Sequence, residues 1–260
     1  MKNKKKTNKV SYLCFRVIRG IVKFCYPRIR NEYAENIPDE PCIVVGNHTK
    51  MNGPISCELY FPSEKYSIWC ASEMMELKKV PAYAYKDFWS GKPRGVRWLY
   101  KILSYLIAPF SVCVFNNAHV IPVHRDIKAI TTFKTTVRSL EDGHKIVIFP
   151  ECLEEHNHIV HKFQDKFIDV ASLYYKKTGK ELSFVPMYIA PELKAIYYGK
   201  PVRYDSAADI DSERLRICEY LMNEITSIAE RLPEHLVVPY NNVSRRHYKS
   251  SRFGIGGDER

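Results

Sequence analysis

The sequence predicts an α/β fold, with a mostly parallel sheet flanked by helices. Short apolar runs rich in β-branched residues recur along the chain, as in strands that are buried on both faces. Stretches with apolar residues at helical spacing lie between these runs, and this alternation is typical of strands joined by crossover helices. The chain has 260 residues, of which 45% are hydrophobic. That is enough for a full core and for one principal domain.

Five runs are the predicted strands. They are CIVVGN at 42–47, YSIWCA at 66–71, HVIPVHR at 119–125, KIVIFP at 145–150 and LSFVPMYIA at 182–190. Four segments are the predicted helices. They are 53–61, with Pro54 in the first turn, 126–143, with Asp126 as N-cap and Gly143 at the end, 163–179, and 211–232. The aromatic-rich section 81–98 has no clear period and is predicted to be an irregular surface or lid.

The basic charge of the chain is concentrated at its amino-terminal end. The chain has 40 Lys and Arg residues and 29 Asp and Glu residues, yet residues 1–30 contain no acid. A nucleic-acid-binding domain would spread basic residues over the fold, so we expect no nucleic-acid partner. Apolar residues from Val10 to Cys25 fall on one half of a helical wheel, while Arg16, Arg19 and Lys23 fall on the other.

A helix of this kind, preceded by a lysine-rich arm, is typical of an anionic membrane surface, although a surface helix docked on the core shows the same pattern. The predicted organisation is therefore a basic amphipathic helix at 1–30, an α/β domain at 31–240 and a flexible basic tail at 241–260. Basic residues interrupt the apolar stretch, which argues against a signal peptide. The best candidate for a span, 102–115, is fourteen residues long and contains Pro109, so it reads as a core or interfacial element.

The eight cysteines form no C-x-x-C pair and no close framework. Thiols in this pattern fit a reducing cytosol. We therefore expect a cytoplasmic protein that binds the membrane surface peripherally.

Three polar residues follow predicted strands. They are His48, Arg125 and Glu151. Ligands in open α/β sheets bind beyond the carboxyl ends of the strands, so we expect these residues to converge there. A histidine, a cation and a carboxylate in one place suit acyl transfer or an anionic substrate.

Four blocks, NHTKMNGP, VIPVHRD, VIFPE and FVPMYIA, occur in this order between residues 40 and 190. They resemble the four blocks of the glycerolipid acyltransferase family, which includes 1-acylglycerol-3-phosphate acyltransferases. The resemblance implies that His48 is a general base that takes a proton from a substrate hydroxyl as it attacks a thioester. It also implies a substrate-binding role for Asn47, Arg125, Pro150 and Cys152. The acyl donor would be acyl-CoA or acyl carrier protein, with no cofactor and no metal.

The first block departs from the family at Gly53, where the family has an aspartate that orients the histidine. In serine proteases, loss of the correct imidazole tautomer lowers turnover about 10,000-fold. Asn52 and Glu151 are both candidates to orient His48 instead. Restoring the acid with Gly53→Asp is expected to raise activity if the chain is catalytically silent.

The third block departs as well, because Cys152 replaces a glycine and Glu154 occupies the position of an arginine. An arginine there would bind a phosphate on the acceptor, whereas a carboxylate repels it. Cys152 is read as a small side chain in the place of the glycine rather than as an acyl-carrying nucleophile. The histidines of EEHNHIVH lack a matching ligand set elsewhere, so a polar loop is favoured over a metal site.

The resulting hypothesis is an acyltransferase of phospholipid metabolism that acts on a lysophospholipid or a related lipid acceptor at a membrane. The alternative is a catalytically silent, lipid-binding relative, which Gly53 and Glu154 favour. A hydrolase that cleaves thioesters is a third possibility, since the same base would activate water. The sequence does not predict an oligomeric state.

Overall fold

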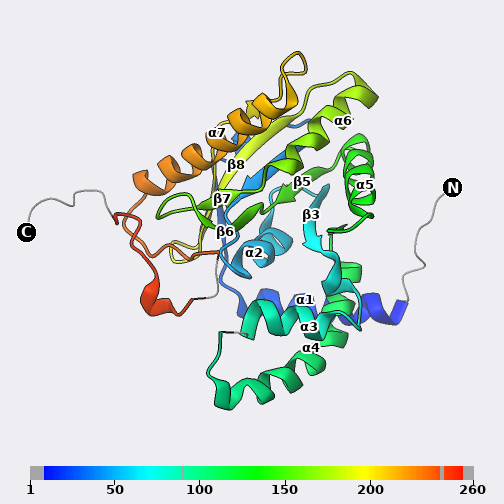
Figure 1. The fold of residues 1–260 in the computed structure, drawn as a ribbon, viewed down its shortest axis with the longest axis vertical. Helices are drawn as coiled ribbons and strands as arrows, with labels where there is room; N and C mark the ends of the chain where they lie inside the picture. Colours follow the sequence, from blue (N-terminus) through cyan, green and yellow to red (C-terminus); the bar gives the residue numbers. More distant parts are fainter. Residues whose placement is uncertain (1–8, 90, 241–242, 254–260) are drawn as a thin grey trace, which may run out of the picture. The chain divides into compact units, whose positions relative to one another are not determined.

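A computed structural model describes residues 9–89, 91–240 and 243–253 of the chain. Figure 1 shows the strands and helices along it. The chain divides into two compact units: unit 1 contains residues 1–27 and 69–132, and unit 2 contains residues 28–68 and 133–260. This division differs from the three consecutive segments that the sequence suggests, because the chain leaves unit 2 after Ile68 and returns to it at Phe133. Each unit is described by itself.

Unit 2 is built on a mostly parallel sheet, as predicted. Its central strand β2 (Cys42–Gly46) pairs in parallel with β5 (Lys145–Ile148) on one side and with β8 (Ser183–Ala190) on the other. Beyond β5 lies β3 (Tyr66–Ala71), which is also parallel. Beyond β8, β9 (Ala195–Tyr198) runs antiparallel, and β1 (Arg30–Glu32) pairs in parallel with β9. The short strand β10 (Val202–Arg203) also pairs with β8.

The β-branched runs form the core of this sheet. Every residue of β2 is buried, and so is every residue of β8 after Ser183. Gly46 ends β2 where no side chain fits, because a Cβ atom there would lie 2.6 Å from Cε of Met187 and 2.9 Å from its carbonyl oxygen. The last residue of β2 therefore has to be glycine for β2 and β8 to approach each other this closely.

Helices flank the sheet. Those with residues in unit 2 are α2 (Asn52–Tyr60), α5 (Ala129–Glu141), α6 (Asp169–Thr178) and α7 (Ile210–Arg231). Helix α7 packs against β8 and α6, and Asp209 caps its first turn by accepting from the amides of Asp211 and Ser212. Short 3₁₀ helices occur at Ala34–Asn36, Asp165–Ile168 and Arg245–His247. A separate antiparallel pair, β6 (Glu151–Glu155) and β7 (His161–Phe163), follows β5.

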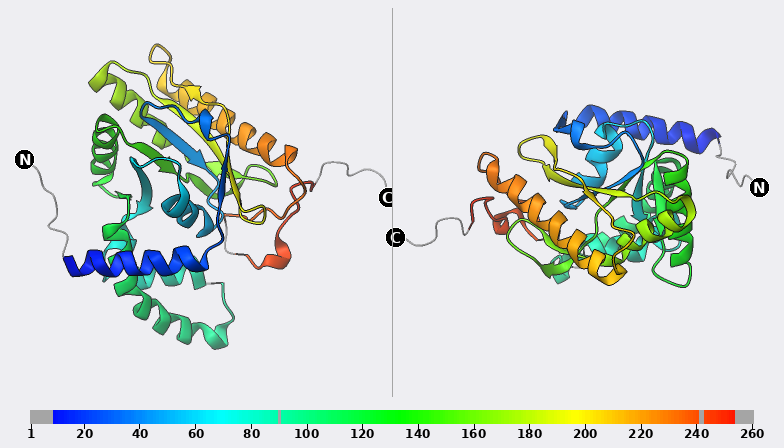
Figure 2. Two further views of the ribbon diagram at one scale, coloured as in Figure 1. Left: turned by 180° about the vertical axis from the view of Figure 1, so that it is seen from behind. Right: turned by 90° about the horizontal axis from the view of Figure 1, so that it is seen from above.

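Unit 1 is mainly helical. Its helices α1 (Lys9–Cys25) and α4 (Arg97–Asn117) lie side by side (Figure 2), and the side chain of Asn117 donates to the hydroxyl of Ser11 (2.9 Å). The section predicted to be irregular forms α3 (Val80–Ala84), a π-helix (Tyr85–Trp89) and a 3₁₀ helix (Arg94–Val96), and another 3₁₀ helix covers Ser72–Met75. Strand β4 (Val120–Val123) pairs with β3, whose residues from Trp69 on belong to unit 1.

Helix α4 is longer than the fourteen-residue apolar run that the sequence suggested. In the part of the chain that the structure describes, Arg94–Asn117 is the one helical stretch long and apolar enough to cross a membrane. Length and composition alone are weak evidence for a span. Only 17% of the most apolar 18-residue part of this stretch is buried, so α4 is not a core helix of unit 1.

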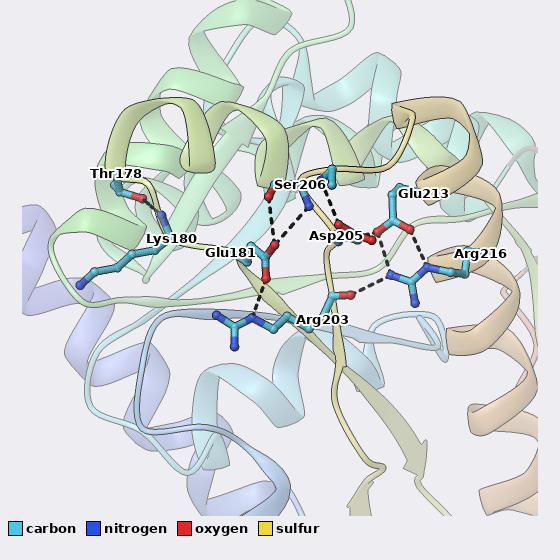
Figure 3. Close-up of polar contacts among 9 residues, drawn as sticks. Thr178, Lys180, Glu181, Arg203, Asp205, Ser206, Glu213 and Arg216 are labelled. Carbon is cyan, nitrogen blue, oxygen red and sulfur yellow. Dashed lines mark hydrogen bonds and ion pairs between the residues drawn. The ribbon is translucent and has the colours of Figure 1, made fainter.

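A network of ion pairs and hydrogen bonds joins Glu181, which precedes β8, and Arg203 of β10 to the start of α7 (Figure 3). The carboxylate of Glu213, whose side chain is 2% exposed, accepts from Nε (2.5 Å) and Nη2 (2.7 Å) of Arg216 and from the amide of Asp205 (2.8 Å). Arg216 also donates to the carbonyl of Arg203. The hydrogen bonds from Arg216 are the main cause of the lowered pKa of Glu213.

The variant Arg216→Ala is expected to lower the free energy of unfolding by about 1–3 kcal/mol, because it removes the charged partner of a buried carboxylate. Since the pKa of Glu213 lies below its ordinary value of 4.5, this stabilisation is present above pH 4.5 and is lost as the pH falls through the lowered pKa. Urea unfolding at neutral and acidic pH measures both effects. Arg231→Ala, which removes an arginine 64% exposed on the same helix, is the control. Equal losses for the two variants would contradict the role of Arg216.

Candidate functional site

The candidate site begins where β2 ends, at Asn47 and His48. The buried side chain of Asn47 accepts from the amide of Ile189 (2.7 Å) and donates to the carbonyl of the same residue (3.1 Å). A side-chain amide carries both the donor and the acceptor that these two bonds need. Asn47 therefore fixes the carboxyl end of β2 to the carboxyl end of β8. This also fixes the backbone at His48, the next residue.

The turn after His48 has an unusual backbone. Thr49 and Lys50 both have positive φ angles, 45° and 56°, a region that residues other than glycine seldom adopt. The carbonyl of Thr49 accepts from the backbone amide and from the side chain of Asn52 (both 3.1 Å), and α2 begins at Asn52. Two consecutive left-handed residues beside a half-buried histidine are a strained feature of the kind that gathers at functional sites.

Glu151 holds this turn from the other side. One carboxylate oxygen accepts from the backbone amide of His48 (2.6 Å), and the other accepts from the backbone amide of His161 (2.9 Å). Glu151 is 3% exposed. Burial raises its pKa from 4.5 to about 7, although the two amide hydrogen bonds oppose this rise. The carboxyl group therefore joins the His48 turn to the β6–β7 pair.

Two aromatic rings contact the imidazole of His48. The ring of Phe149, which follows β5, lies 5.3 Å away between centroids at an angle of 62°. The ring of Tyr240 lies 5.7 Å away at 79°. Both are edge-to-face arrangements, and Nδ1 of His48 is buried. Tyr240 also lies 5.8 Å from the ring of His161.

The chain after α7 folds back over this end of unit 2. Lys50 donates to the carbonyl of Val243 (2.7 Å) and to the hydroxyl of Tyr248 (2.8 Å), and Ser251 is fully buried. Residues 243–253, which the sequence placed in a flexible tail, are thus held against unit 2. A cavity of about 280 Å³ lies here, lined by Asn52, Pro191, Glu192, Leu236, Val238, Arg245 and Tyr248.

The remaining predicted site residues are spread more widely. Pro150 is buried and its carbonyl accepts from the amide of Gln164, and Cys152 is half-buried in β6. Glu154, at the position of the family's arginine, forms an exposed ion pair with Lys162 (3.1 Å). Arg125 is exposed and follows β4 in unit 1. The structure thus brings together Asn47, His48, Asn52 and Glu151 in unit 2, and the anion-binding role of Arg125 stays a prediction.

The histidine-rich segment forms ordinary protein contacts. Nε2 of His158 lies 3.2 Å from the carbonyl oxygen of Ser251, and His156 is exposed. Among the described residues, no group of three or more His, Cys, Asp or Glu side chains is arranged to hold a metal ion.

No model of a known protein family matches this chain, and no curated protein matches it. Among solved structures, the chain is similar to the crystal structure of the 1-acyl-sn-glycerophosphate (LPA) acyltransferase PlsC from Thermotoga maritima. The identity is 16% and the TM-score 0.49, over 90% of this chain and 86% of the other. At this level, the likeness assigns neither an activity nor site residues to this chain.

The missing acid at Gly53 has a steric reason. A Cβ atom at position 53 would lie 2.5 Å from the carbonyl oxygen of His48 and 3.1 Å from the ring of Phe149. Since Gly53 also donates its amide to that carbonyl (3.2 Å), a side chain here displaces the His48 turn itself. The structure therefore argues against the expectation that Gly53→Asp restores activity.

We expect Gly53→Ala and Gly53→Asp each to lower the free energy of unfolding by about 1–3 kcal/mol, because both add the colliding Cβ atom. Neither variant is expected to raise acyl transfer. Urea unfolding and the transfer assay measure the two effects, and Gly95→Asp, at a position with nothing within 4 Å, is the control. An active Gly53→Asp variant of unchanged stability would contradict this reading of the turn.

Two residues at the site escaped the sequence reasoning as functional candidates: Phe149 and Tyr240. Phe149 lies inside the third block, VIFPE, so its place in that motif could have marked it as a candidate. The sequence marks His161 only as a candidate metal ligand in EEHNHIVH, whereas the structure places it against Glu151 and Tyr240. Tyr240 contacts His48 through the tertiary fold, and no local pattern marks it.

Proposed function

We propose that the protein is an acyltransferase that moves a fatty acyl group from a thioester donor, acyl-CoA or acyl carrier protein, to a hydroxyl of a lysophospholipid or related lipid. One observation carries this proposal. The bond between His48 and Glu151 (2.6 Å) joins the first and third blocks beyond adjacent parallel strands. The bonds of Asn47 to Ile189 add the fourth block at the same edge. This edge is where α/β sheets bind their ligands.

In the proposed reaction, the imidazole of His48 takes the proton of the acceptor hydroxyl as its oxygen attacks the thioester carbonyl. This attack forms the C–O bond of the new ester. The C–S bond of the donor then breaks, and the proton passes from His48 to the departing thiolate. Asn47 and Glu151 act by fixing the backbone on either side of the catalytic imidazole. Because Glu151 reaches His48 through its amide, we assign it a positioning role.

The acceptor differs from that of the family at the third block. Glu154 and Lys162 neutralise each other at the surface, so this position offers no free cation for a phosphate. We therefore include lipid alcohols among the acceptors, beside lysophospholipids. Arg125 remains the proposed anion ligand.

The test uses purified protein with acyl-CoA or acyl carrier protein and a panel of lysophospholipids and lipid alcohols in liposomes. Formation of an acylated lipid supports the proposal. Liposome binding without turnover on any acceptor would instead favour the second candidate, a silent lipid-binding relative. The observation behind this candidate is that position 53 has no room for the acid that orients the histidine in the family. Loss of thioester without an acceptor would indicate a hydrolase.

We propose that unit 1 binds the cytoplasmic membrane surface peripherally. On α1, the side chains of Leu13 and Phe24 are 61% and 92% exposed, and on α4 those of Tyr105, Leu106 and Phe110 are 61–69% exposed. Exposed apolar residues gathered on neighbouring helices mark an interaction surface. The basic residues of the first thirty positions suit anionic lipids.

Deletion of residues 1–26 is therefore expected to weaken sedimentation with anionic liposomes, and about 0.5 M salt is expected to weaken it partly. The double variant Leu13→Ser with Phe24→Ser tests the apolar part alone. Its control is Leu215→Ser, which alters a leucine 62% exposed on α7 of unit 2. Unchanged binding after the deletion would place the membrane surface on α4 or elsewhere.

A further inference from the structure

Two aromatic rings from separate parts of unit 2 contact the imidazole of His48. Phe149 follows β5, whereas Tyr240 follows α7. The interplanar angles of 62° and 79° place both rings edge-to-face with the imidazole. Aromatic pairs of this geometry contribute about 0.5–1.5 kcal/mol each beyond their buried area. Two such contacts together are enough to favour one ring orientation over others by about 5- to 160-fold.

The position of Tyr240 is fixed by anchors before it and after it. Before it, the buried His235 has Nδ1 2.7 Å from the carbonyl oxygen of Pro233 and Nε2 2.7 Å from the hydroxyl of Tyr188. Because Nδ1 faces a carbonyl, it carries the proton, so Nε2 accepts from Tyr188 when His235 is neutral.

After Tyr240, the chain returns to the same place. The amide of Ser251 donates to the carbonyl of His235 (2.8 Å), and the amide of Val237 donates to the carbonyl of Lys249 (2.9 Å). Lys50, two residues after His48, holds the carbonyl of Val243. Tyr240 therefore lies between two anchored stretches, 235–237 and 243–251, and the second of them is bonded to the His48 turn.

Position 53 cannot supply an orienting carboxylate without displacing the His48 turn, since its Cβ would lie 2.5 Å from the carbonyl oxygen of His48. We propose that Tyr240 is a positioning residue which, together with Phe149, holds the imidazole of His48 in its reactive orientation. In the family that this sequence resembles, a carboxylate orients the histidine. Here the contacts with the two aromatic rings orient it instead. Tyr240, which follows α7, is then part of the active site. This inference rests on the proposed acyl transfer.

The experiment compares Tyr240→Phe, which keeps the ring, with Tyr240→Ala, which removes it. Phe253→Ala is the matched control, because it removes a ring 57% exposed on the same segment. Two quantities are measured. The first is kcat and KM for acyl transfer, and the second is the NMR spectrum of the His48 ring, assigned with His48→Gln. The spectrum needs no substrate.

We expect Tyr240→Ala to lower kcat about ten-fold or more with little change in KM, because misplacing a reacting group by about 1 Å costs up to 100-fold in rate. It should also shift and broaden the His48 ring signals while circular dichroism stays unchanged. Tyr240→Phe and Phe253→Ala should match the unmodified protein in both measurements.

Unaltered His48 signals in Tyr240→Ala would overturn the inference whether or not the protein transfers acyl groups. Equal losses of kcat in Tyr240→Phe and Tyr240→Ala would also overturn it, because the hydroxyl rather than the ring would then be needed. If the unmodified protein transfers no acyl group, the proposed function fails. Shifted His48 signals confined to Tyr240→Ala would in that case still support the packing role of the ring.

Discussion

Acyl transfer by the His48→Ala variant is expected to be about 100- to 10,000-fold slower than by the unmodified protein, since general base catalysis contributes that much. The measurement is kcat with the best acceptor of the panel. The fold should survive, because the bond that Glu151 makes at this residue is to the backbone amide, which alanine retains.

The control is His156→Ala, which removes an exposed histidine between β6 and β7. It should transfer acyl groups at the unmodified rate. Equal urea midpoints for both variants would show that the loss in His48→Ala is chemical. Transfer at full rate by His48→Ala would remove His48 from the mechanism.

Glu151→Ala is expected to lower the free energy of unfolding by about 2–5 kcal/mol, because it leaves the buried amides of His48 and His161 without their acceptor. Glu151→Gln should lose about 1–3 kcal/mol, since the amide oxygen still accepts from one of the two while its NH₂ group faces the other. Urea unfolding measures both. The control is Glu155→Ala, on the same strand as Glu151. It removes an exposed carboxylate that pairs with Lys249, and it should cost about 1 kcal/mol or less. Similar losses at positions 151 and 155 would contradict the special role of Glu151.

The raised pKa of Glu151 gives this pair of variants a pH dependence. Between its ordinary value of 4.5 and about 7, the folded protein keeps a proton that the unfolded chain has lost. The contribution of Glu151 to stability therefore falls as the pH rises through this range. Glu151→Gln should consequently cost more stability at about pH 5 than at about pH 7. A cost that stays constant, or that grows with pH, would show that the carboxyl group is not held protonated.

The strands and helices that surround the site could be predicted because their signals are local. The predicted runs at 42–47, 145–150 and 182–190 are β2, β5 and β8, and α5 and α7 follow the predicted helical spacing. Strand β6 could not be predicted, because its sequence ECLEE has no β-branched residue and three carboxylates. Two of the three crossings between the units also left no local trace, since they lie inside β3 and inside α5, whereas the first, after Pro27, lies near the predicted boundary at residue 30.

The site was predictable as far as strand ends could place it. His48 and Glu151 each follow a strand closely, and parallel strands bring such residues to one edge. The role of Asn47 was expected from the resemblance alone. The sequence showed that Gly53 departs from the family, but the backbone oxygen that excludes a side chain there is visible only in three dimensions. Tyr240 could not be assigned, because its contact with His48 depends on the anchors of His235 and Ser251 rather than on any periodicity.

The contacts of Lys50 and Tyr240 also bear on the order in which the molecule is assembled. A ribosome completes the histidine turn long before it makes Tyr240 and residues 243–251, which contact that turn and the end of unit 2 around it. A nascent polypeptide that has emerged only as far as α7 would therefore display its imidazole to water. Under the proposed mechanism, the reactive orientation of this ring is thus established late in translation.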